Sequence, residues 1–163
     1  MVIAERREVV VYLRELSTLL NQVSETRRAW IHELSPLLRD AERRDPLTIA
    51  RSAVSLGREH LTAFRDARAK LRTLNPPAEC MTCHAAALSW LDEHVTACER
   101  LVRAGETRDV RRLRSAQEPL ADARACAQRI TIEYSRLVDD LRQHVPRRNT
   151  SQSFWSRFRR SPN

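Results

Sequence analysis

Apolar residues recur at intervals of three and four positions along nearly the whole chain, which is the spacing of one face of an α-helix. Four such segments follow one another, at about residues 3–44, 46–74, 78–105 and 110–145. Short polar connections join them, and short connections favour antiparallel neighbours. The pattern therefore predicts an all-α fold, an antiparallel up-down-up-down four-helix bundle.

The first segment carries a heptad seam that only Arg27 interrupts. Pro36 is expected to kink or restart this helix, because it removes a backbone donor and clashes with the preceding turn. At about 42 residues the helix would span roughly 60 Å, which is longer than the second and third helices. Part of its seam would then be uncovered within one chain, so we expect self-association or a helical protein partner.

The boundaries of the other helices are marked by their capping residues. Asp45-Pro46 supplies a capping side chain followed by proline at the first helical position, and Asn75-Pro76-Pro77 separates the second helix from the third. Gly105 stands where a helix C-cap is expected. The fourth helix begins either near Val110 or at Ser115, where Ser115-Ala116-Gln117-Glu118 has capping-box spacing, and Pro146 ends it.

Composition supports this fold class and divides the chain into two parts. Two glycines in 163 residues nearly exclude a β-sandwich or barrel. The formal net charge is +8, and more than half of it comes from five arginines after residue 145, where there is no acid. We therefore predict a bundle domain over 1–145 and a flexible basic-aromatic tail over 146–163.

No segment of the sequence carries a recognisable catalytic pattern. A phosphate-binding glycine loop, a nucleophile motif and the paired Glu-x-x-His of di-iron bundles are all missing from the sequence. We therefore expect a non-enzymatic protein. The charged start lacks a signal-peptide pattern, which predicts a cytoplasmic location, either free or at the membrane periphery. An extracytoplasmic location is expected only if an export signal is missing from this chain.

The strongest chemical signal is Cys80-Met81-Thr82-Cys83-His84, the only place where two thiols and an imidazole lie within five residues. Four interpretations are open: haem c attachment, a zinc site, a redox dithiol, or a buried cluster in which no cofactor is bound. On a helix the three side chains share one face. Cys126 joins them as a fourth zinc ligand if the turn before the last helix centres near Glu106. Cys126 does not join the site if the turn centres near residue 110.

The redox interpretation has a physical basis, since a thiol near a helix N-terminus is expected to have a lowered pKa. The Cys-x-x-Cys-His string on a helical bundle resembles the cytochrome c-prime group, and the resemblance covers Cys80, Cys83 and His84. It implies covalent haem with His84 on the iron. The sequence around residues 70–140 also resembles uncharacterised bacterial helical-bundle proteins, which implies that the histidine belongs to the scaffold.

The tail interleaves aromatic rings with guanidinium groups. If it becomes helical, Phe154 and Phe158 share a face. Such a segment suits an anionic membrane surface or a groove on a protein partner. We expect nucleic acid to be an unlikely partner, because the bundle shows no basic stripe. The residues expected to dock are Phe154, Trp155, Arg157, Phe158, Arg159 and Arg160.

Overall fold

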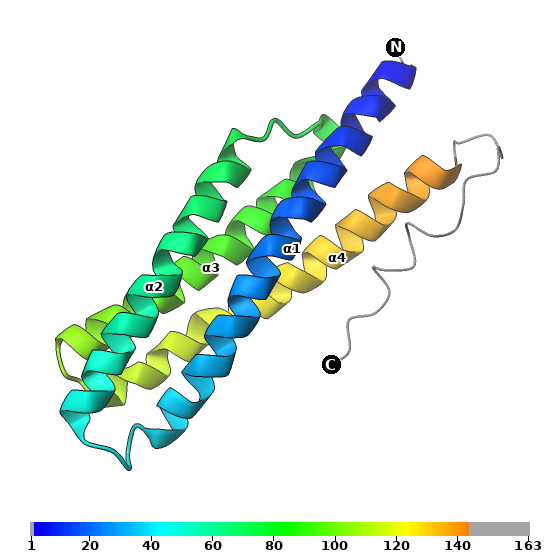
Figure 1. Cartoon of the computed structure of the whole chain (residues 1–163). Helices are drawn as coiled ribbons and strands as arrows, with labels where there is room; N and C mark the ends of the chain where they lie inside the picture. The colour runs from blue at the N-terminus through cyan, green and yellow to red at the C-terminus, as the bar shows by residue number, and fades with distance from the viewer. Residues whose placement is uncertain (1, 144–163) are drawn as a thin grey trace.

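The computed structural model describes residues 2–143, and these residues form an all-α arrangement of four long helices (Figure 1). The predicted fold class is confirmed. The long helices are α1 (Val2–Asp40), α2 (Pro46–Thr73), α3 (Met81–Glu106) and α4 (Glu118–Gln143). Two 3-10 segments, η1 (Ala78–Cys80) and η2 (Val110–Gln117), precede α3 and α4. No helix within residues 2–143 has the length and apolar character needed to cross a membrane.

The helices run up, down, up and down, and they pack unevenly. α2 lies closely along α3, and α3 along α4, whereas α1 packs mainly on α2 and approaches the backbone of α4 only sparsely (Figure 1). Three ion pairs tie α2 to α3 along their length, namely Arg58–Glu106, Arg65–Glu99 and Arg68–Asp92. The α2–α3 hairpin is therefore the most tightly joined part of the bundle.

Both glycines of the chain lie buried at this interface. A Cβ atom on Gly105 would lie 2.5 Å from the backbone oxygen of Ala50, and one on Gly57 would lie 3.0 Å from the backbone oxygen of Cys98. A Cβ atom at Gly105 would clash with the α2 backbone, and one at Gly57 would be crowded against the α3 backbone, so these glycines allow α2 and α3 to approach each other. The expectation that Gly105 caps α3 is wrong, since Gly105 lies inside the helix.

Other helix boundaries also differ from the sequence expectation. α1 continues through Pro36 to Asp40 without a restart, because a proline removes only one of many helical hydrogen bonds. Asp45 does cap α2, accepting a 2.9 Å hydrogen bond from the backbone N–H of Thr48. α4 begins at Glu118, and the Ser115 hydroxyl donates back to the Arg112 carbonyl rather than capping α4.

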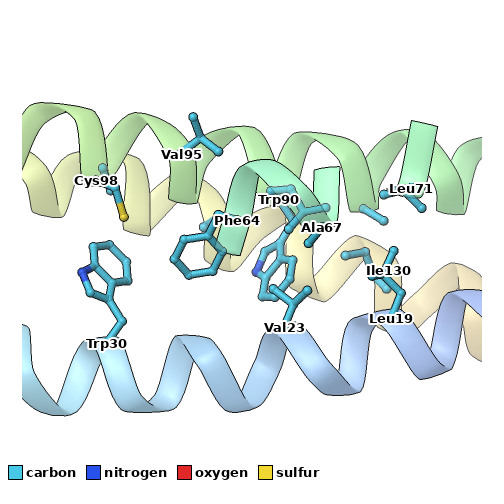
Figure 2. Close-up of a cluster of buried hydrophobic side chains, with 14 of the residues drawn as sticks. Leu19, Val23, Trp30, Phe64, Ala67, Leu71, Trp90, Val95, Cys98 and Ile130 are labelled. Carbon is cyan, nitrogen blue, oxygen red and sulfur yellow. The ribbon is translucent and has the colours of Figure 1, made fainter. Parts of the chain in front are cut away.

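The centre of the bundle holds an aromatic cluster contributed by three helices (Figure 2). Trp30 of α1 and Phe64 of α2 meet edge to face with ring centroids 5.7 Å apart. His94 of α3 is wholly buried against Trp30, Phe64 and Trp90, with centroids 6.0, 5.0 and 4.6 Å away. These rings hold α1 on the α2–α3 hairpin by apolar packing.

Candidate functional site

The residues of the Cys-x-x-Cys-His motif lie where η1 passes into α3. Cys80 ends η1, and Cys83 and His84 follow in the first turn of α3. All three side chains are buried and face the interior of the bundle. The expectation that they share one face is therefore met, and that face is turned toward α1 and α4 rather than toward solvent.

His84 is held by a tyrosine of the first helix. The Tyr12 hydroxyl and the Nδ1 atom of His84 are 2.9 Å apart in a buried hydrogen bond between α1 and α3. Burial lowers the pKa of His84 and raises the pKa of Tyr12, and the nearby thiols of Cys83 and Cys80 raise the latter further when ionised. The imidazole and the phenol are thus kept neutral, as a buried hydrogen-bonded pair requires.

The two thiols are also kept neutral. Burial raises the pKa of Cys80 to about 11, helped by Glu79, and raises that of Cys83 to about 11, helped by Cys80 and Glu133. The expected lowering of the Cys80 pKa is wrong, because desolvation of the thiolate outweighs the field of the helix end. The Cys83 sulfur lies 4.0 Å from the Ile130 carbonyl oxygen of α4, which makes it a weak donor across the α3–α4 interface.

Tyr134 of α4 completes the cluster. Burial raises the pKa of Tyr134, a hydrogen bond with Ser17 of α1 lowers it, and Cys83 raises it further. Polar side chains of α1 are therefore bonded to α3 through Tyr12 and to α4 through Ser17. We call this set the α1 clamp; it consists of Tyr12, Ser17, Cys80, Cys83, His84 and Tyr134.

Cys126 lies apart from this cluster. It is partly buried on α4, one turn before Ile130, and its pKa is raised by burial and by Glu93 and Asp122. Within residues 6–143, no three side chains of His, Cys, Asp or Glu are grouped closely enough to hold a metal ion. The three-thiolate, one-imidazole arrangement does not form, because α4 places Ile130 rather than Cys126 opposite Cys83.

The packed arrangement does not fit covalent haem either. Thioether bonds to a porphyrin need both sulfurs at the edge of a space large enough for the macrocycle. Here the Cys80 and Cys83 side chains are fully enclosed, and the Ile130 carbonyl stands against the Cys83 sulfur. A porphyrin at these thiols would require α4 to move away from α3.

Sequence reasoning missed Tyr12, Ser17 and Tyr134 as partners of the motif. Tyr12 precedes the seam residue Leu13, and its burial could have been anticipated from a wider apolar face, but its pairing with His84 could not. The tail residues expected to dock, from Phe154 to Arg160, lie outside the described residues. Comparison with protein-family models, curated proteins and solved structures gives no match for this chain.

Proposed function

We propose that this protein is a non-enzymatic helical interaction or scaffold module, in which the Cys-x-x-Cys-His motif stabilises the fold. The observation that carries the proposal is the state of the α1 clamp. Its imidazole is bonded to Tyr12 and its thiols are enclosed with raised pKa values. Groups that could perform chemistry are thereby committed to holding α1, α3 and α4 together.

Exposed apolar side chains on α1 and α4 support the interaction role. Val10 and Val11 in the amino-terminal part of α1 are 44% and 50% exposed, and Ile132 of α4 is 66% exposed. That part of α1 extends beyond the neighbouring end of α2 (Figure 1). A second copy of the chain or a helical partner would bury these side chains. Light scattering that finds a strict monomer at all concentrations would count against self-association.

The tail is the second element of this proposal. Its arginines and aromatic rings would dock on an anionic membrane surface or in a groove of a protein partner. Deletion of residues 146–163 should abolish sedimentation with phosphatidylserine-containing vesicles or capture of the partner. A matched variant replaces Phe154, Trp155 and Phe158 by serine and keeps every arginine. Unchanged vesicle and partner binding after the deletion would rule out tail docking.

The alternative function is binding of haem or zinc through Cys80, Cys83 and His84. Cys80, Cys83 and His84 share one buried face at the start of α3, but as packed they are not grouped closely enough to hold a metal ion, so this alternative requires the site to rearrange. Elemental analysis of protein purified from its own host separates the two proposals. One iron or one zinc per chain, lost in a Cys83→Ser variant, would support the alternative. Metal-free protein with an intact fold would support the α1 clamp.

A further inference from the structure

An open groove lies at the end of the bundle where α2 begins and α3 ends, the end that holds the α1–α2 connection (Figure 1). Its volume is about 550 Å³, within the range of ligand-binding clefts. Its apolar lining includes Leu47 and Val54 of α2, close to the point where Gly105 of α3 brings the two helices together. Guanidinium groups also line the groove. Its lining includes Leu47, Arg51, Val54, Arg58, Gly105 and Arg108.

The guanidinium groups give the groove an uncompensated positive charge. Arg58 is paired with Glu106 at 2.8 Å. Within the described part of the chain, neither Arg51 nor Arg108 has an ion pair, although Asp45 and Arg51 influence each other at longer range. The carboxylate of Asp45 is occupied in capping α2. Two arginines therefore face the groove without a carboxylate partner.

The backbone at Arg108 is also unusual. Arg108 has a φ of 55°, in the left-handed region, and it follows the end of α3, where glycine is the favoured residue. A residue with a side chain is strained at such a position relative to glycine. The Arg108 side chain lines the groove. The left-handed conformation belongs to the cap of α3, in which the N–H of Asp109 donates to the Ala104 carbonyl at 3.0 Å and the N–H of Arg108 donates to the Gly105 carbonyl at 3.1 Å. This cap fixes the backbone at Arg108 beside the groove.

We propose that this groove binds an acidic peptide segment of a protein partner. Carboxylates of the segment pair with Arg51 and Arg108, and an apolar side chain between them packs on Leu47 and Val54. Charge complementarity and the apolar floor carry this choice of occupant. None of the described residues that line the groove is aromatic, so it lacks the rings on which the bases of single-stranded nucleic acid commonly stack.

The test measures binding of a short fluorescent peptide in which leucine and glutamate alternate, by anisotropy with the full-length protein. The wild type should bind this peptide, and a matched leucine–glutamine peptide should bind more weakly. Arg51→Gln and Arg108→Gly should each weaken binding by about 1.5-fold to fivefold, the range for exposed charge pairs. Raising the salt concentration should remove the difference between the two peptides.

Arg108→Gly separates binding from folding, because it removes the side chain and relieves the left-handed strain. Its melting temperature should be equal to or higher than that of the wild type while its affinity falls. Arg72→Gln, an exposed arginine at the far end of α2, is the matched control and should bind like the wild type. If Arg51→Gln and Arg108→Gly bind like Arg72→Gln, the peptide is held by the tail or elsewhere, and the proposal is overturned. Preference for a single-stranded RNA probe over the acidic peptide at this groove would also overturn it.

Discussion

The wholly buried histidine of the aromatic cluster should make the stability of this protein depend on pH. Nδ1 of His94 lies 2.7 Å from the carbonyl oxygen of Trp90. A carbonyl oxygen can only accept a hydrogen bond, so Nδ1 carries the hydrogen and Nε2 presents a lone pair. That Nε2 atom has no hydrogen-bond partner among the described residues. The ring is therefore neutral, and a proton added at Nε2 would be buried without an acceptor.

The size of the effect follows from the pKa. Burial, with a smaller contribution from Arg27 of α1, lowers the pKa of His94 from 6.5 to about 4, although the hydrogen bond to Trp90 acts in the opposite direction. Between these values the unfolded chain binds a proton that the folded protein does not bind. The contribution of neutral His94 to the free energy of unfolding is thus fully present above pH 6.5 and is lost as the pH falls toward 4. At 1.36 kcal/mol per pKa unit, the loss is about 3 kcal/mol.

The assay is urea denaturation at a series of pH values from 7.5 to about 4, for the wild type and for His94→Leu. Leucine cannot titrate, and the Trp90 carbonyl retains the ordinary helical hydrogen bond from the backbone at position 94. As the pH falls from 7.5 to about 4, the free energy of unfolding of His94→Leu should decrease by about 3 kcal/mol less than that of the wild type. Carboxylates titrate in both proteins, so the comparison uses the difference between the two curves.

His32→Gln is the matched control, because His32 lies on the exposed surface of α1. Its curve should follow that of the wild type. Parallel curves for the wild type and His94→Leu would refute the reasoning, because they would mean that His94 is protonated in the folded protein as readily as in the unfolded chain. The same conclusion would follow if an NMR titration of the His94 ring gave a pKa near 6.5.

Three further predictions concern the α1 clamp, the glycine contact and the thiols. Tyr12→Phe should lower the free energy of unfolding by about 1–2 kcal/mol in urea, because Nδ1 of His84 loses its buried partner; an unchanged midpoint would contradict this. Gly105→Ala should lower the free energy of unfolding by about 1–3 kcal/mol in thermal melts, although alanine has a helix propensity about 1 kcal/mol better than that of glycine. The control Ser52→Ala, on the exposed face of α2, should leave the free energy of unfolding nearly unchanged. Maleimide labelling of the native protein at neutral pH, read by mass spectrometry, should reach Cys126 first and the three wholly buried cysteines only in denaturant; equal labelling would refute it.

Periodicity was sufficient to predict the helices because burial of one face is a local property of the sequence. The cap at Asp45 was predictable for the same reason, since its hydrogen bond to Thr48 spans three residues. The sequence left the register between α3 and α4 open between two turn positions, and the contact of Cys83 with Ile130 matches the turn centred near Glu106. Eight residues of η2 rise by about 2.0 Å each instead of 1.5 Å, and this connection decides which residue of α4 faces Cys83. The position of Cys126 therefore depended on a turn whose geometry no periodic pattern encodes.

The candidate site shows the same division between local and distant information. That Cys80, Cys83 and His84 share a face follows from helical spacing, but the chemistry of that face depends on what packs against it. Tyr12 lies 72 residues before His84, and their hydrogen bond engages the Nδ1 atom of the imidazole. Arg108 is a further case: the sequence favours Gly105 as the residue in the left-handed conformation, yet close packing against Ala50 requires the glycine inside α3.

The unequal packing of the helices links the α1 clamp to the interaction role. α2 and α3 are joined by close backbone approach and by ion pairs along their length. α1 lacks such an approach to α4, and its amino-terminal half is tied to α3 and α4 by the hydrogen bonds of Tyr12 and Ser17. A partner that competes for the apolar face of α1 would have to break this small set of buried polar contacts. Because an unpaired buried polar group is costly, the clamp adds to the energy that the apolar packing of α1 already requires for its separation from the rest of the bundle.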